Sequence, residues 1–142
     1  MSEYISRLAD FLVELTNDAL TNSFVPVSLE LAGIKAIDID DLTLNQDLLR
    51  AMWGKESPFE TIDDDRIQYG AYLTATLRDD EDGFPEGESA GIAYLGGEFT
   101  PQYHSVTRYT EYRPGEPFYP NYSFSHEIGH NLGIYHPHNS TL

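Results

Sequence analysis

The most constraining feature of this sequence is the run HEIGHNLGIYH at residues 126–136. A helix turns about 100° per residue, so His126 and His130 lie on one face, one turn apart, where two imidazoles can share a metal ion. On a continuing helix His136 would point away from that face. Gly133 lets the chain leave the helix, because glycine adopts the positive φ with which helices commonly end. The run therefore predicts a helix that ends at Gly133 and folds back to bring a third histidine to the metal.

The chemistry of this residue set is that of catalytic zinc. Three protein ligands leave one coordination position open, whereas structural zinc sites are closed by four ligands that usually include cysteines, and this chain has none. Glu127 directly follows the first histidine, so we expect it to act as general base towards zinc-bound water and to pass the proton to a leaving amine. We therefore expect one catalytic Zn²⁺ held by His126, His130 and His136, with Gly133 as the structural turn.

The complete run resembles the active-site motif of the metzincin clan of zinc endopeptidases. Asn131-Leu132-Gly133 is most similar to the reprolysin (adamalysin) branch. Upstream, the stretch AGIAYLGG at residues 90–97 and the following Ser105-Val106 resemble the substrate-binding edge strand of that branch and the next strand. The resemblance assigns substrate binding to Gly91, Ile92, Ala93, Tyr94 and Leu95. Two earlier stretches, at residues 70–77 and 27–34, resemble further strands of the same sheet.

The resemblance implies an α+β fold of the metzincin upper-domain (α/β) type. We expect a twisted mixed β-sheet with an edge strand over the cleft, packed on two long helices that include the zinc-binding helix. Residues 1–142 are interpreted as a single partial metzincin catalytic domain, made of the N-terminal subdomain and the active-site helix. The implied activity is zinc-dependent hydrolysis of peptide bonds in a peptide or protein substrate, in a secreted or extracellular location.

The sequence also departs from the family pattern. Only six residues follow His136, and the methionines are Met1 and Met52, so the Met-turn and the C-terminal subdomain have no counterpart. No strand precedes the first helix, so the sheet is expected to lack one interior strand. Pro137 is more similar to the serralysin branch, since reprolysins usually have Asp there. We expect a fragment of a longer protease, and a non-catalytic zinc-binding fragment or pseudoprotease remains an open alternative.

Composition narrows the remaining classes. With 142 residues and 40% hydrophobic residues, the chain is expected to form one folded domain. A net charge of −16 opposes binding to nucleic acid. No stretch is long and apolar enough for a membrane span, and no signal peptide is recognisable. The lack of cysteine excludes disulfides, unlike the animal and venom reprolysins, and favours a prokaryotic origin. The oligomeric state cannot be read from the sequence.

The acidic run from Asp79 to Gly83 raises the possibility of calcium binding. It fails the EF-hand pattern, because Arg78 occupies the first ligand position if Gly83 is the turn glycine. We therefore interpret the run as a solvated loop. An acidic calcium-dependent interaction module, in which the histidines are incidental, remains an alternative from a different functional class.

Hydrophobic periodicity predicts the remaining elements. We expect helices over about residues 3–21 and 44–54, an acidic connector over 56–66, and strands at about 27–34, 69–77, 92–95 and 105–110. His104 and His138 are interpreted as surface histidines outside the zinc set.

Overall fold

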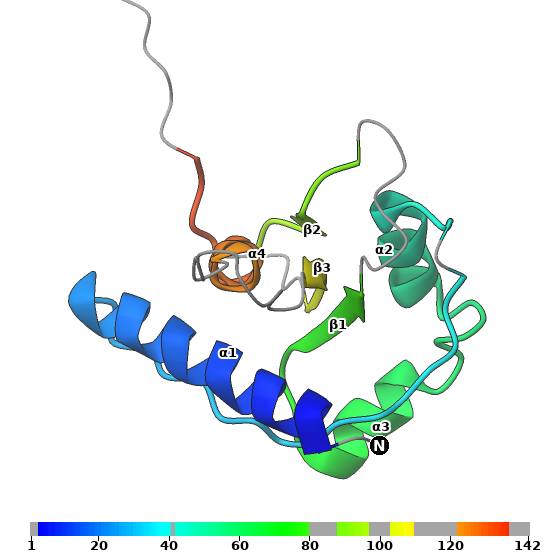
Figure 1. Cartoon of the computed structure of the whole chain (residues 1–142), viewed down its shortest axis with the longest axis horizontal. Coiled ribbons are helices and arrows are strands. Elements are labelled where there is room, and N and C mark those ends of the chain that lie inside the picture. The colour runs from blue at the N-terminus through cyan, green and yellow to red at the C-terminus, as the bar shows by residue number, and fades with distance from the viewer. Residues whose placement is uncertain (1–2, 41, 80–87, 97–102, 110–121, 137–142) are drawn as a thin grey trace, which may run out of the picture.

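The computed structural model describes residues 3–40, 42–79, 88–96, 103–109 and 122–136 (Figure 1). Within these ranges the elements in chain order are α1 (Glu3–Asn22), α2 (Asn45–Gly54), α3 (Ile62–Tyr69), β1 (Thr74–Asp79), β2 (Gly91–Ala93), β3 (His104–Tyr109) and α4 (Ser123–Asn131). The two helices expected near residues 3–21 and 44–54 are confirmed as α1 and α2. The acidic run at 79–83 lies mostly outside the described residues.

The sheet is small and mixed, with the strand order β1-β3-β2. β1 pairs with β3 in parallel, and β2 pairs with β3 antiparallel. Val106 of the central strand lies opposite Thr76 on one side and Ile92 on the other. The predicted α+β fold, a mixed sheet with an edge strand, is confirmed, and the structure adds that the edge strand β2 is antiparallel.

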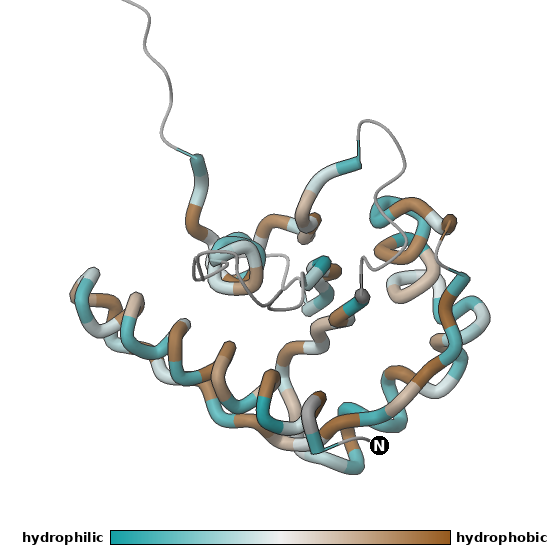
Figure 2. The backbone as a smooth tube through the Cα atoms, viewed as in Figure 1, coloured by the Kyte–Doolittle hydropathy of each residue, from teal (hydrophilic) through white to brown (hydrophobic). Residues whose placement is uncertain are grey.

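Helices cover both faces of the sheet. On one face α1 and α4 bury Leu8, Leu12, Phe124 and Ile128, and the β1 residue Ala75 packs against them. Figure 2 shows hydrophobic and hydrophilic residues alternating along α1, as expected of a helix with one buried side.

The opposite face packs against α2. Here Leu48, Leu49 and Met52 join Phe59 and Val106 in a second buried cluster. Thr76 also faces this side, and its hydroxyl donates to Met52 Sδ at 3.4 Å. Neighbouring β1 residues thus point to opposite faces, and the sheet is buried on both.

The strand expected at residues 27–34 is wrong. This segment is extended but pairs with no strand among the described residues, and it runs back alongside α1 (Figure 1). The Asn17 side chain holds it: Asn17 Nδ2 donates to Leu29 O at 2.9 Å, and Leu29 N–H donates to Asn17 Oδ1 at 2.6 Å. Alternating hydrophobicity therefore correctly indicated an extended conformation but did not determine whether a partner strand lies beside it.

The connector expected at residues 56–66 is also wrong in part, because α3 begins at Ile62 and delays the following strand to Thr74. Its sequence has almost no hydrophobic periodicity, which is why the helix was missed. Asp63, Asp64 and Asp65 occupy the first turn, where negative charge stabilises the helix dipole. Gly70 ends the helix with a φ of 66°. These end signals were present in the sequence and outweigh the missing apolar stripe.

Candidate metal centre

α4 carries the first two histidines of the predicted zinc set on one side, one turn apart. The helix is anchored from beneath by buried Phe124 and Ile128, so the histidines face away from the core. A polar contact adds to this anchoring. Thr16 of α1 donates its hydroxyl to Leu12 O at 2.7 Å, so Ser125 donates the second bond, Ser125 Oγ to Thr16 Oγ1 at 2.7 Å.

Gly133 ends this helical segment and redirects the chain. Its φ is 91°, in the left-handed region that favours glycine. Gly133 N–H donates to His130 O at 2.9 Å and Ile134 N–H donates to Gly129 O at 2.9 Å, the two hydrogen bonds of a Schellman motif. The chain then turns back so that His136 lies beside the histidines of α4.

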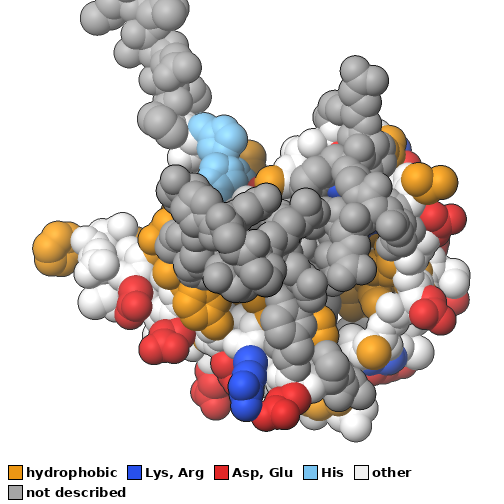
Figure 3. Space-filling model, viewed as in Figure 1, with side chains coloured by type: hydrophobic (Ala, Val, Ile, Leu, Met, Phe, Trp, Pro, Cys, Tyr) orange, Lys and Arg blue, Asp and Glu red, His pale blue; other side chains and the backbone are white. Residues whose placement is uncertain are grey.

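The three histidines converge through their Nε2 atoms. The separations are 3.0 Å for His126–His130, 3.0 Å for His130–His136 and 2.9 Å for His126–His136. Zinc–imidazole bonds of about 2.0–2.1 Å in tetrahedral geometry place ligand nitrogens about 3.3–3.4 Å apart. The observed spacing is close to this value. Figure 3 shows histidine side chains at the surface, well separated from the Asp and Glu side chains on the lower edge of that view.

The protonation states also fit a metal site. His130 Nδ1 lies 2.7 Å from Ile134 O. A carbonyl oxygen only accepts, so Nδ1 carries the hydrogen and Nε2 presents its lone pair to the shared centre. Burial, and then the neighbouring His130 and His136, lower the pKa of His126. The neutral imidazole that binds metals is thereby favoured. The three residues fit a zinc ion.

Glu127 lies beside this triad and is almost fully buried, with 6% of its surface exposed. Burial raises the pKa of Glu127, and the nearby His130 partly opposes that rise. The side chain packs against the edge strand at Gly91. A Cβ at Gly91 would lie 2.8 Å from both Glu127 Cγ and Glu127 Oε1. The bare backbone at this position makes room for the carboxylate.

A groove of about 640 Å³ joins the edge strand to the histidines. Its lining residues are Ser89, Ala90, Gly91, Ile92, Ala93, Tyr122, Ser123, His126, Glu127, His130 and His136. Three of the five predicted substrate-binding residues line it. Tyr94 instead packs against the α2 cluster, and Leu95 lies beyond β2 with 47% of its surface exposed.

Sequence reasoning missed two residues that join the groove's two sides. Asn131 Nδ2 donates to Tyr94 O and to His104 O, both at 3.0 Å, and so ties α4 to the edge segment and to β3. Gly96 N–H donates to His130 O at 2.8 Å. A Cβ at Gly96 would lie only 1.9 Å from Asn131 O, so the backbones meet there without space for a side chain. The glycine pair at residues 96–97 was the available signal.

His104, expected at the surface, is buried with 4% exposure as the first residue of β3, so that expectation is wrong. Buried and exposed residues do not alternate along β3, because both faces of this central strand are covered, and so His104 is buried as well. Burial, with a further contribution from the positive charge of Arg66, lowers the pKa of His104 to about 4. His138 lies outside the described residues.

Comparison with known proteins agrees with this geometry. Residues 8–137 match the metallopeptidase family M12B, reprolysin-like. The chain belongs to this M12B family. The predicted resemblance is confirmed at family level, and the chain is a domain of metallopeptidase type. The structure adds a histidine triad that is compatible with zinc. No curated protein and no solved structure matches the chain significantly.

Family membership indicates the class of substrate, and the structure bears on membrane insertion. Metallopeptidases of this kind act on peptides or proteins. None of the helices described here is long and apolar enough to cross a membrane.

Proposed function

We propose that this M12B chain is a zinc-dependent endopeptidase domain, and that residues 1–142 comprise the N-terminal subdomain and active-site helix of a metzincin catalytic domain. One observation carries the proposal: three convergent Nε2 atoms, a buried glutamate and an edge strand share a single groove. His126, His130 and His136 would hold the zinc. The ion, when bound, supplies a positive charge that polarises water and the carbonyl of the bond to be cut.

Glu127 is the proposed general base. It lies next to the first ligand in sequence and faces the same groove as all three. The raised pKa of Glu127 lies closer to neutral pH than that of an ordinary glutamate, which suits a group that accepts a proton from water and returns it to a leaving amine. In this scheme Glu127 handles the proton while the histidines hold and orient the metal.

β2 is the proposed seat of the substrate backbone. Among the described strands it pairs only with β3, so its outer edge offers N–H and C=O groups to an extended peptide. Gly91, Ile92 and Ala93 line the groove beside Glu127, which would put a bound backbone next to the base. Tyr94 and Leu95 extend the same edge beyond the groove.

The decisive experiment compares the natural chain with Glu127→Gln. Bound zinc is measured by metal analysis after dialysis, and proteolysis is measured on an unstructured protein. We expect one zinc per chain in both proteins and a loss of cleavage of about 10²–10⁴-fold in the variant, the contribution typical of a general base. Equal cleavage by both proteins would exclude Glu127 as the base.

Zinc binding without turnover is the competing function. Metzincins place a methionine beneath the zinc, whereas Met52 is fully buried in the α2 cluster and no other described residue is a methionine. Stoichiometric zinc in the natural chain, with no cleavage at any enzyme concentration, would favour this alternative.

A further inference from the structure

The backbone of β2 directs alternate residues towards its open edge. Arg108 N–H donates to Ala90 O at 2.8 Å, so the carbonyl of Ala90 points at β3. Successive residues of a strand direct their backbone groups to opposite sides, so Ile92 also bonds towards β3. Gly91 and Ala93 then direct their N–H and C=O groups outwards. An extended peptide that adds to this edge would pair with these two residues.

The side chains of the same edge alternate between the two faces of the sheet. Gly91 lies on the α4 face, where an added Cβ would meet Glu127. Ile92 and Tyr94 lie on the opposite face and pack against the α2 cluster. Residues that lie opposite one another on neighbouring strands point to the same face. Every second side chain of a bound peptide would therefore point to the face that α2 covers.

An exposed aromatic pair lies on this face beside the edge. The ring centroids of Trp53, near the end of α2, and Tyr94 are 6.2 Å apart, with an angle of 71° between the ring planes. α2 packs over β3 and β2 and buries Leu49 and Met52 against the sheet. Trp53 remains 59% exposed. A peptide side chain on the α2 face would therefore meet an aromatic surface next to Tyr94.

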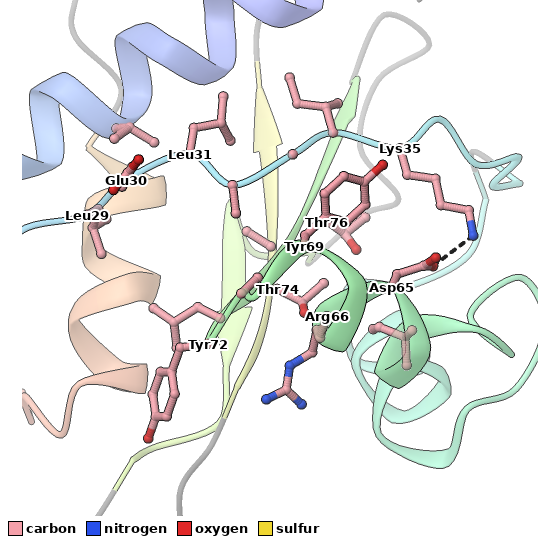
Figure 4. Close-up of a pocket in the computed structure, with 18 of the residues that line it drawn as sticks. Leu29, Glu30, Leu31, Lys35, Asp65, Arg66, Tyr69, Tyr72, Thr74 and Thr76 are labelled. Atoms are coloured by element: carbon pink, nitrogen blue, oxygen red, sulfur yellow. Dashed lines mark hydrogen bonds and ion pairs between the residues drawn. The ribbon is translucent and has the colours of Figure 1, made fainter.

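The opposite edge of the sheet carries a similar pair that already holds a cation. The ring centroids of Tyr72 and Tyr103 are 5.1 Å apart, and Tyr72 is 60% exposed. The guanidinium carbon of Arg66 lies 4.0 Å from the centre of the Tyr103 ring, a cation–π contact. Figure 4 shows Arg66 and Tyr72 in the groove on that side of the sheet. No Lys or Arg of the described part of the chain makes such a contact with Trp53 or Tyr94.

The charge around Trp53 favours a cation as the missing partner. Glu56 N–H donates to Ala51 O at 2.9 Å, which holds Glu56 against the end of α2, and its carboxylate lies next to Gly54. Glu56 forms no ion pair with any residue that the structure describes. The nearest basic residues in the sequence are each paired with an aspartate: Arg50 with Asp47 at 3.6 Å, and Lys55 with Asp63 at 2.7 Å. The net charge of −16 attracts basic peptides to the whole chain.

We propose that the Trp53–Tyr94 pair binds a basic side chain, Arg or Lys, of an extended peptide on β2, so that this M12B domain selects basic substrates. The proposal rests on the proposed function of β2 as the seat of the substrate backbone. The aliphatic stem of the basic residue would cover the indole, and its charge would lie near the Glu56 carboxylate. The peptide would supply at this edge the cation that Arg66 supplies at the other.

The first test follows peptide binding through the fluorescence of Trp53, the one tryptophan of the chain. Zinc-loaded Glu127→Gln protein is titrated with the peptide Ser-Val-Thr-Arg-Thr-Val-Ser and with the same peptide carrying citrulline, which has nearly the shape of arginine without its charge. We expect a change in Trp53 emission and a Kd about five- to tenfold lower for the Arg peptide. The difference should shrink at high salt. Equal Kd values, or no binding of the Arg peptide, overturn the proposal.

Matched variants test the site, with binding measured by calorimetry. Trp53→Leu removes the ring and keeps an apolar side chain, and Tyr72→Leu makes the same change at an equally exposed position of the opposite edge. We expect the preference for Arg over citrulline to fall below about twofold in the first variant and to persist in the second. Glu56→Gln should reduce the preference, whereas Glu30→Gln, which removes a charge from the groove beside β1, should not. Preference retained in Trp53→Leu, or equal losses in a variant and its control, overturn the assigned site.

Cleavage assays separate this proposal from the proposed function. With the natural chain and an unstructured peptide, we expect kcat/KM to be about five- to tenfold higher for Arg than for citrulline. The cut bond should lie at a fixed number of residues from the Arg. Cleavage without preference for Arg overturns the basic side-chain site and leaves the endopeptidase function standing. Binding of Arg that depends on Trp53, without cleavage, supports the side-chain site and counts against endopeptidase activity.

Discussion

Gly91→Ala provides a sharp test of how the groove works. A Cβ at this position would lie 2.8 Å from Glu127 Cγ and Oε1. Ordinary contacts between such atoms are about 3.5 Å or longer, so the carboxylate has to move by about 0.7 Å. The backbone itself accepts alanine, because the φ of Gly91 is not positive. The substitution therefore displaces the proposed base without requiring the strand to refold.

We expect a large effect on catalysis and a small effect on stability. A misplacement of about 1 Å costs on the order of 10²-fold in rate, equivalent to about 2.7 kcal/mol of transition-state stabilisation. Zinc stoichiometry should be unchanged, since the three atoms nearest to the added carbon all belong to Glu127 and none to a histidine. The midpoint of thermal unfolding should move by only a few degrees, about 1 kcal/mol or less.

The assay is kcat/KM for an unstructured substrate, measured in a double-mutant cycle with Glu127→Gln. If Gly91→Ala acts through the carboxylate, it should have little further effect in the Glu127→Gln background. Gly54→Ala is the matched control, because Gly54 is exposed and the nearest atom to its added Cβ would be Glu56 Oε1 at 3.4 Å, an ordinary contact distance. Full activity in Gly91→Ala, or an equal loss in both backgrounds, would refute the reasoning.

Three further outcomes follow from the structure. Because burial holds the pKa of His104 at about 4, below its ordinary 6.5, the unfolded chain takes up this proton first as the pH falls. The contribution of this residue to the free energy of unfolding is therefore present above pH 6.5 and is lost progressively towards pH 4, by up to about 3 kcal/mol. Urea unfolding of zinc-free protein at a series of pH values should show this decrease, and His104→Gln should reduce it. Asn131→Leu leaves the carbonyls of Tyr94 and His104 without their donor and should lower the free energy of unfolding by about 1–3 kcal/mol, whereas a change within 0.5 kcal/mol would contradict the tie between α4 and the sheet. Saturating zinc at about a thousand times its Kd should stabilise the chain by about 4 kcal/mol; calorimetry with and without chelator should show this difference, which His136→Ala should largely remove.

Local signals in the sequence were sufficient to predict the convergence of the three histidines. Helical spacing alone sets His126 beside His130, and a left-handed glycine alone redirects the chain towards His136. Both are properties of a few consecutive residues, which is why the structure reproduces the expected arrangement in detail, including the φ of 91° at Gly133. The helix boundaries of α1 and α2 follow from the same kind of short-range periodicity.

Where local signals conflicted, prediction failed. The three aspartates at the start of α3 and the glycine that follows it indicated a helix, whereas the missing apolar stripe indicated a connector. The structure forms the helix. His104 looked like a surface histidine because its burial depends on elements that pack over β3 from elsewhere in the chain.

By itself, the sequence indicated the three candidate ligands, the proposed base and the turning glycine, because each depends on spacing within one helix or one turn, while the mixed sheet with its edge strand was expected from the family resemblance. Only the tertiary structure decided that Gly91 makes room for Glu127, that Asn131 bonds to Tyr94 and His104, and that segment 27–37 stands apart from β1. The contacts of Gly91 and Asn131 join residues 27 to 37 positions apart. No local propensity records such a contact, because it forms only when the packing of whole helices against the sheet brings the two backbones together.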